Sequence, residues 1–432
     1  MLAIKRSIPA MCSWLILTFV ILSRQSAGAV GVVTTPWSPV AVSGFGDGGL
    51  VLTDFDPDWV RAGALAQQAD GKLIVAGYMY SGSDSRFLLA RYTPTGVVDT
   101  TFGENGAVVS DFGQQSNFTA VHVQSDGKIV AGGKLWLDFA IIRYNEDGSL
   151  DTSFNDTGLA TISFGRNGYG TDFFIQPDGK IMAAGTLQED YFVPGDLALM
   201  RLNPDGSLDT TFQGTGMLTI DLGGSELSAA LTRQEDGTFI LAATADQDFA
   251  VLRFNEDGSL DSTFNNTGIV VTDFGGPDAA RDLEVQTDGK IVVAGNYLYS
   301  HYAMQRLNTD GSPDTSFDND GQLVDSDTDG PLMGITLQPD GKIVVAAEGL
   351  YDFRLARYLS DGSLDTDFGG NGRVTTDFGG YDTPVDLVLQ SDGKFVVAGY
   401  SLQTKLALAR YLENGSLDFV TSQLFLPMVL HY

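Results

Sequence analysis

The stretch QTDGKIVVAG, residues 286–295, has the pattern of a β-hairpin: a polar turn centred on Asp-Gly, followed by branched apolar residues. The turn aspartates of its successive copies are 56, 52, 58, 52, 52 and 52 residues apart. A period of this length predicts a repeat architecture in which each copy is one supersecondary unit. The other copies are QADGKLIVAG (68–77), QSDGKIVAGG (124–133), QPDGKIMAAG (176–185), QEDGTFILAA (234–243), QPDGKIVVAA (338–347) and QSDGKFVVAG (390–399).

Each repeat carries a second turn motif, as in RFNEDGSLD (253–261), and then a glycine-rich apolar segment. These pieces predict four short strands per repeat, named a to d in order. No segment has a sustained apolar period of 3.6 residues, so we expect almost no helix. Representative strands are a at 281–286, b at 290–295, c at 249–254 and d at 268–274.

Four strands in about 50 residues, repeated seven times, predict an all-β fold: a seven-bladed β-propeller with four-stranded blades. FGDGGLVLTDF (45–55) reads as a lone strand d, whereas the repeat pattern stops at ENGSLDF (413–419), before a seventh strand d. We therefore expect the N-terminal strand to complete the last blade and close the ring, which removes exposed strand edges. A solenoid, the alternative, would carry capping repeats at both ends.

The two turn motifs also resemble those of a known family. The pattern Q-x-D-G-K-I-V-V-A-G, followed by A-R-Y-N-x-D-G-S-L-D-T-x-F-G, is similar to the delta-60 repeat of bacterial exported proteins. The resemblance covers residues 45–419, with both motifs in all seven copies. It implies a propeller-like fold and a bacterial source, and it implies no activity.

The segments outside the repeats predict export. Residues 1–29 have a basic start, an apolar run and a small-residue cleavage site ending at Ala29, as in a cleaved signal peptide. The only cysteine, Cys12, lies in this segment, so the mature chain would be secreted or displayed on the cell surface without disulfides. Residues 30–43 read as a linker and 44–420 as the propeller. The apolar tail 421–432 is expected to add a strand to the closing blade; a role in attachment is the alternative.

Charge restricts the class of partner. The chain has 25 basic and 55 acidic side chains, a net charge of −30, and loss of Lys5, Arg6 and Arg24 with the signal makes it −33. Such a charge argues against nucleic acid and anionic membrane as partners. No membrane-spanning segment would remain after signal cleavage, and we expect a monomer. Solubility outside the cell and attraction for cations are both compatible with this charge.

A catalytic group occurs once, whereas a group present in every repeat is first a structural device. An arginine on strand c and an aspartate eight residues later recur in all seven repeats, so we interpret them as blade-internal ion pairs or turn fasteners. Because strands alternate in direction, the b–c and d–a loops share one end of the ring, and these loops vary between repeats. Function should therefore lie on that face.

Aromatic residues are frequent in the b–c loops, and they are the predicted ligand-binding residues. Tyrosine and tryptophan offer large, stiff surfaces with a polar tip, which suits sugar stacking or protein recognition. The alternative is that these rings only pack between neighbouring blades. The residues are Tyr78, Tyr80, Trp136, Tyr191, Phe192, Tyr297, Tyr299, Tyr351 and Tyr400.

The sixth copy departs from the repeat pattern at DSDTDG (325–330). Asp325, Asp327 and Asp329 match the start of a calcium loop, in which alternating carboxylates converge on one cation. Thr336 stands where the closing glutamate of such a loop would be. Calcium is therefore a candidate cofactor, and an acidic surface turn is the alternative.

Three functions follow from these patterns. The first is a non-catalytic binding or scaffold module that recognises glycan or protein through its variable loops. The second is a propeller hydrolase or lyase acting on polysaccharide, with carboxylates near the ring axis. The third is a purely structural ring stabilised by calcium. The chain contains no HExxH, GxSxG or P-loop motif, which favours the non-catalytic function.

Overall fold

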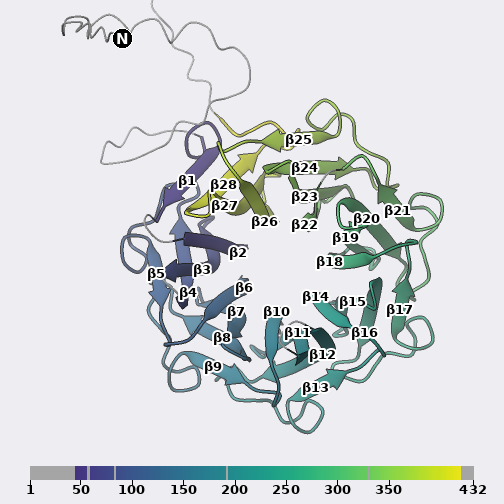
Figure 1. Cartoon of the computed structure of the whole chain (residues 1–432), viewed down its shortest axis with the longest axis horizontal. Helices are drawn as coiled ribbons and strands as arrows, with labels where there is room; N and C mark the ends of the chain where they lie inside the picture. The colour runs from purple at the N-terminus through teal and green to yellow at the C-terminus, as the bar shows by residue number, and fades with distance from the viewer. Residues whose placement is uncertain (1–43, 56–58, 82–83, 191–192, 329, 420–432) are drawn as a thin grey trace, which may run out of the picture.

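The computed structural model describes residues 44–55, 59–81, 84–190, 193–328 and 330–419. Within these residues 28 strands form seven separate four-stranded antiparallel sheets. The sheets stand as blades around a common axis, with strand a of each blade innermost (Figure 1). The predicted all-β, seven-bladed propeller is confirmed. Among the described residues, no helix has the length and apolar character needed to cross a membrane.

The blades follow one another along the chain, and the strands of each run in order from the innermost to the outermost. Blade 1 is β2 (Trp59–Gln67), β3 (Leu73–Ser81), β4 (Asp84–Tyr92) and β5 (Ala107–Ser110); blade 2 is β6 (Ser116–Val123), β7 (Ile129–Leu135), β8 (Asp138–Tyr144) and β9 (Leu159–Ile162). Blade 3 is β10 (Gly168–Ile175), β11 (Ile181–Asp190), β12 (Val193–Leu202) and β13 (Met217–Ile220); blade 4 is β14 (Glu226–Arg233), β15 (Phe239–Ala245), β16 (Asp248–Phe254) and β17 (Ile269–Thr272). Blade 5 is β18 (Asp278–Val285), β19 (Ile291–Tyr297), β20 (His301–Leu307) and β21 (Gln322–Asp325); blade 6 is β22 (Leu332–Leu337), β23 (Ile343–Gly349), β24 (Asp352–Tyr358) and β25 (Arg373–Thr376). Blade 7 is β26 (Asp382–Leu389), β27 (Phe395–Ser401), β28 (Lys405–Tyr411) and β1 (Leu50–Asp54).

Blade 7 joins the two ends of the described chain. Strand β1 pairs antiparallel with β28, with Leu50 opposite Ala409 and Asp54 opposite Lys405. The N-terminal strand is therefore the outermost strand of the last blade (Figure 1), and the predicted closure of the ring is confirmed. The segments 1–29, 30–43 and 421–432, with their predicted roles, lie outside the described residues.

The Asp-Gly turns form the inner hairpins as the sequence predicts. Asp288 accepts a hydrogen bond from the backbone N–H of Lys290, and Gly289 has a φ of 82°, a conformation that other residues adopt at a cost. The strand bounds differ from prediction mainly at strand a, which begins at Asp278 and not at Arg281. This extension carries strand a across a β-bulge between Ala280 and Asp282, and every blade has a bulge at the same place.

The hydrophobic core lies between blades. Each of seven buried clusters draws side chains from two neighbouring sheets, as where Ile240 and Val251 of blade 4 meet Leu283 and Ile291 of blade 5. A single four-stranded blade therefore has two apolar faces that only its neighbours can cover, which is the physical reason for the ring.

The repeated arginine joins each blade to the next. Arg253 donates through Nε to Asp261 at 2.8 Å, and through Nη2 to Thr263 at 2.9 Å. Its Nη1 donates to the backbone carbonyl of Thr309, in the c–d turn of blade 5, and its guanidinium lies over the Phe264 ring. The predicted structural role of the repeated residues is confirmed. The ion pairs are Arg91–Asp99, Arg143–Asp151, Arg201–Asp209, Arg253–Asp261, Arg306–Asp314, Arg357–Asp365 and Arg410–Asp418.

The same contact closes the ring. Arg410 of blade 7 donates to the carbonyl of Pro94 in blade 1 at 2.6 Å. In blade 1, burial raises the pKa of Asp99, but the hydrogen bonds from Thr101 and the charge of Arg91 outweigh it and hold that pKa at about 2. Asp99 is therefore a charged partner of Arg91 throughout the physiological pH range.

Replacing one of these arginines should destabilise the ring. Arg253→Met would leave the buried Asp261 carboxylate without its partner, so we expect the free energy of unfolding to fall by about 3–5 kcal/mol. Urea unfolding followed by fluorescence measures this. The control Arg86→Ala removes a surface pair with Asp111 and should cost less than about 1 kcal/mol. Equal small losses in both variants would contradict the role assigned to Arg253.

Candidate functional site

The variable loops lie together at one end of the ring. Wherever the structure describes them, the b–c turns and the d–a loops meet there, and we call this end the loop face. Tyr351, in the b–c turn of blade 6, and Tyr381, in the d–a loop that follows, have ring centroids 4.2 Å apart. The two kinds of loop thus form one surface, as the alternation of strand direction predicts.

The exposed tyrosines and tryptophans gather on the loop face. Tyr299 is the most exposed, with 76% of its surface accessible. Every exposed residue of these two types in the described part of the chain lies on this face. They are Trp59, Tyr80, Trp136, Tyr299, Tyr351 and Tyr381.

The predicted ligand-binding residues divide into two groups. Tyr80, Trp136, Tyr299 and Tyr351 are exposed, as a contact surface requires. The others that the structure describes are half-buried: Tyr78 packs edge-on against Tyr80, Tyr400 lies under the Arg61 guanidinium, and Tyr297 packs against the core between blades 4 and 5. Tyr191 and Phe192 lie outside the described residues. Whether any of these residues binds a ligand stays a prediction.

Three b–c turns on this face use residues that are unusual for their backbone conformation. Leu298 and Tyr299 in blade 5 have φ values of 48° and 71°, and Leu350 and Tyr351 in blade 6 have φ values of 48° and 76°. Leu402 and Gln403 in blade 7 have φ values of 52° and 61°. Two-residue hairpins with positive φ at both positions normally contain Asn-Gly, and bulky residues there are strained. The strained turn of blade 6 holds both side chains outward, with 69% of Leu350 and 52% of Tyr351 exposed. Strain retained in this way is typical of functional sites.

Three aspartates on the innermost strands form an acidic cluster near the ring axis. Asp282, just after the bulge in β18, accepts from the N–H of Leu283 and from the N–H of Ile335 in blade 6, both at 2.7 Å. Asp172 in β10 and Asp386 in β26 make the corresponding bonds to the next blade. Both oxygens of each carboxylate are therefore engaged with backbone, and their first role is to fasten neighbouring blades.

The axial environment raises the pKa of several acids. Burial, and then the negative charges of Glu284 and Asp386, hold the pKa of Asp282 well above its ordinary value. Burial and the charge of Asp172 raise that of Asp386 to about 6, although its backbone hydrogen bonds oppose the shift. Burial and the charge of Asp386 raise the pKa of Glu284 to about 7. His122 lies here too, with its Nε2 4.0 Å from Asp172 Oδ1. Titratable side chains of blades 2, 3, 5 and 7 thus lie close together around the axis.

The acidic turn of blade 5 is linked to blade 6. Asp325 accepts from the Tyr358 hydroxyl at 2.6 Å and from the Arg373 guanidinium at 2.5 Å. A guanidinium therefore stands where a cation bound by Asp325 would be. Asp327 is almost fully exposed, and Asp329 lies outside the described residues. The calcium loop predicted from these aspartates stays a prediction.

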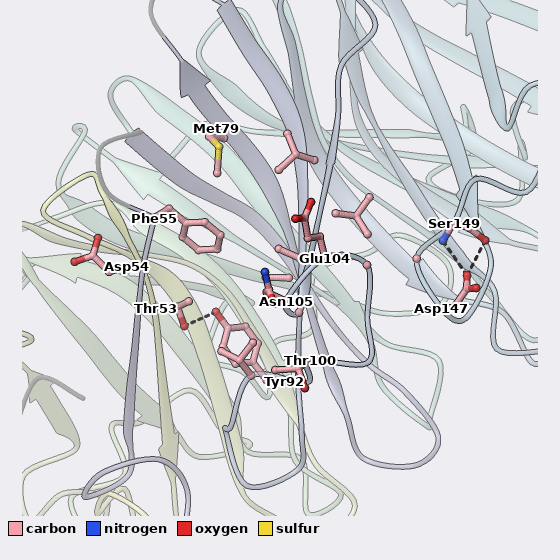
Figure 2. A pocket seen from close by; sticks show the side chains of 18 residues that line it. Thr53, Asp54, Phe55, Met79, Tyr92, Thr100, Glu104, Asn105, Asp147 and Ser149 are labelled. Carbon is pink, nitrogen blue, oxygen red and sulfur yellow. Dashed lines mark hydrogen bonds between the residues drawn. The ribbon is translucent and has the colours of Figure 1, made fainter. Parts of the chain in front are cut away.

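A pocket of about 930 Å³ lies along the outer strands of blades 7 and 1 (Figure 2). Tyr92 is one of its lining residues and donates to Thr53 at 2.8 Å. Asp54 and Asp147 lie at opposite ends of the view in Figure 2, so they do not form a pair of cooperating carboxylates. The pocket is lined by strand ends and c–d turns, not by the aromatic residues of the loop face.

Comparison with protein families places the chain. A family model described as "Domain of unknown function (DUF5122) beta-propeller" matches seven segments that together make up just over half of the sequence. The chain belongs to the DUF5122 β-propeller family. The matched residues are 68–102, 124–154, 176–212, 234–264, 286–317, 338–368 and 390–418, one segment for each repeat.

Solved structures share the fold of this DUF5122 propeller at low sequence identity. A catalytically inactive virginiamycin B lyase from Staphylococcus aureus with quinupristin has a TM-score of 0.53 and 10% identity over 86% of this chain and 99% of its own. A protein from Lactobacillus plantarum has a TM-score of 0.53 and 14% identity over 81% and 95%. Sqt1 from Chaetomium thermophilum has a TM-score of 0.51 and 10% identity over 84% and 98%. These likenesses show the fold alone. No curated protein is a significant match.

The raised pKa of Glu284 predicts a pH-dependent effect. Because the folded state binds this proton more tightly than the unfolded state, stability should fall as pH rises from about 4.5 to 7. Glu284→Gln removes this charge and should raise the free energy of unfolding at pH 8 by about 1–3 kcal/mol, with little effect at pH 4. Urea unfolding at both pH values measures this. Asp327→Asn, the same change of charge at an exposed site, should show no such dependence; a matching response would contradict the assignment.

Proposed function

We propose that this chain is an exported, non-catalytic recognition module that binds glycan or an extracellular protein through its loop face. The observation that carries the proposal is the grouping there of all the exposed tyrosines and tryptophans in the described residues. Scattered apolar residues are normal on a protein surface, whereas aromatic residues gathered on one end are typical of binding surfaces.

The chemistry of these side chains suits both classes of partner. A tyrosine or tryptophan ring offers a flat apolar face for a sugar ring or an apolar side chain, with a polar tip that hydrogen-bonds to hydroxyl or amide groups. The strained turn at Leu350 and Tyr351 supports the proposal, because ordinary turn residues would form the same hairpin without exposing apolar surface.

Export supports the same function. A leader of the signal-peptide type and a strongly negative charge suit a protein that works in the extracellular medium. The resemblance of the two turn motifs to delta-60 repeats supports an exported bacterial protein that is secreted or displayed on the cell surface. Calcium remains a candidate stabiliser of such a ring.

A hydrolase or lyase that acts on polysaccharide is the second candidate. It is favoured by the axial carboxylates, since the pKa of Glu284 is about 7 and suits a general acid or base at neutral pH. It is disfavoured by the hydrogen bonds that occupy both oxygens of Asp172, Asp282 and Asp386. Because these three carboxylates accept hydrogen bonds from backbone N–H groups, they are poorly placed to act on a substrate.

The proposal is tested by binding to soluble and insoluble polysaccharides. The chain should be retained by at least one of them, and the triple variant Trp136→Ala, Tyr299→Ala, Tyr351→Ala should lose at least tenfold in affinity, because each exposed ring contributes about 1 kcal/mol or more. Affinity electrophoresis and sedimentation with the insoluble polymers measure this.

The matched control is Val97→Ala, Leu260→Ala, Val271→Ala, which removes exposed apolar side chains away from the loop face. It should bind as the unaltered chain does. Equal losses in the two triple variants would contradict a site on the loop face. Release of reducing or unsaturated sugar ends during the assay would favour the enzyme, and Glu284→Gln should then abolish that release.

A further inference from the structure

Three carboxylates converge on the loop face where blade 4 meets blade 5. Asp248 begins strand c of blade 4, Asp273 follows its strand d, and Asp278 begins strand a of blade 5. One oxygen from each carboxylate lies within 4.8 Å of the other two. The cluster therefore links the inner strand of one blade to two strands of its neighbour.

The innermost acid of this cluster has an oxygen with no partner. Only 3% of Asp278 is exposed, and its Oδ2 accepts from the N–H of Phe274 at 2.7 Å. Its Oδ1 is buried and makes no hydrogen bond. A buried carboxylate oxygen without a partner costs free energy, so a ligand that supplies positive charge would be bound favourably there.

The neighbouring charges make this cost larger. The carboxylates of Asp248 and Asp273 lie within 4.8 Å of that of Asp278, so three negative charges repel one another at this interface. Within the part of the chain that the structure describes, no ion pair joins a lysine or arginine to any of the three clustered carboxylates.

At other blade interfaces, a lysine or arginine side chain neutralises the carboxylate at the equivalent position. Where blade 7 meets blade 1, Lys405 stands at the position of Asp248, and its Nζ lies 3.4 Å from Asp54, the counterpart of Asp273. Where blade 1 meets blade 2, Arg86 pairs with Asp111 at 3.1 Å, and Ser116 replaces the innermost acid. A cation thus occupies this place in the fold when fewer acids are present.

We propose that Asp248, Asp273 and Asp278 form a binding site for a hard divalent cation, calcium, that clamps blade 4 to blade 5 on the loop face. Calcium prefers six to eight oxygen ligands at about 2.3–2.6 Å, so oxygens on opposite sides of the ion are about 5 Å apart. The observed spread of the three oxygens fits within that sphere. Water completes the coordination on the side of Asp273, which is exposed.

The cluster recurs at two other interfaces. Asp352, Asp377 and Asp382 repeat it between blades 6 and 7, with one oxygen of Asp382 held by the N–H of Phe378. The third copy, Asp196, Asp221 and Glu226 between blades 3 and 4, includes an ion pair from Arg166 to Asp196. Arg354 lies close enough to Asp352 for its charge to act on that carboxyl, so both further copies are partly neutralised by the protein. The cluster between blades 4 and 5 is therefore the strongest candidate for a calcium site.

The clusters are linked to b–c turns of the loop face. The N–H of Asp278 donates to the carbonyl of Gln247 in the b–c turn of blade 4, and that of Asp382 donates to the carbonyl of Tyr351. Bound calcium would hold these turns by fixing the aspartates to which they are attached. The cation site is nevertheless independent of any glycan, and it is tested with calcium alone.

The experiment measures calcium bound by the full chain after removal of metal with chelator. Equilibrium dialysis with radioactive calcium, from micromolar to millimolar concentration, should show saturable binding, and Asp278→Asn should bind one ion fewer per chain than the unaltered protein. Asp273→Asn, a change at an exposed position, should lose the same ion without disturbing the core. The control Glu235→Gln, an equal change of charge at an exposed position in the a–b turn of blade 4, should keep every ion.

Thermal unfolding gives a second readout. Millimolar calcium should raise the Tm of the unaltered chain and of Glu235→Gln, and it should raise the Tm of Asp278→Asn and Asp273→Asn by a smaller amount. Absence of saturable binding at millimolar calcium would overturn the proposal. So would equal numbers of bound ions in the unaltered chain and in Asp273→Asn, provided that both elute as folded monomers.

Discussion

The bond from a buried arginine to the next blade is the interaction on which the ring depends. A four-stranded blade has apolar residues on both faces and cannot fold alone, so each blade needs two neighbours in fixed positions. The guanidinium fixes the position of the neighbouring blade, because one side chain binds both an aspartate of its own blade and a turn carbonyl of the next. Its planar group of donors suits such a divided task better than the ammonium of lysine. Seven such contacts, including the one from Arg410 to Pro94, join the blades into a closed ring.

This constraint separates the two ends of the propeller. The end that carries the a–b and c–d turns is occupied by the arginine contacts and their Asp-Gly turns, so its sequence is nearly the same in every repeat. The loops of the loop face do not take part in these arginine contacts, and they differ in length and residue type. Exposed aromatic residues and converging carboxylates are found on this face, while the axial aspartates fasten the inner strands below it. A rigid ring that presents variable loops is a common way to build a binding surface.

Much of the fold could be predicted from the sequence, because its determinants are local or strictly repeated. The Asp-Gly turns fix the hairpins, and the eight-residue spacing of Arg253 and Asp261, repeated in every copy, is enough to predict their ion pair. The functional surface was less predictable. The turn at Leu350 and Tyr351 lacks the Asn-Gly signal of its conformation, so only the backbone reveals its strain. The acidic clusters also have no motif, since Asp248 and Asp278 are 30 residues apart and meet only across a blade interface. Calcium-loop spacing predicts a separate site at Asp325, Asp327 and Asp329, of which Asp325 contacts Arg373.

The central claim is that the loop face is the recognition surface of this propeller. Hydroxyl-radical footprinting tests it most directly, with the chain free and bound to whichever polysaccharide or extracellular protein retains it. We expect Trp136, Tyr299 and Tyr351 to be strongly protected from oxidation in the complex, while Phe419, which is exposed outside this surface, is oxidised equally in both states. A complex in which these three residues remain as reactive as in the free chain would contradict a recognition role for the loop face.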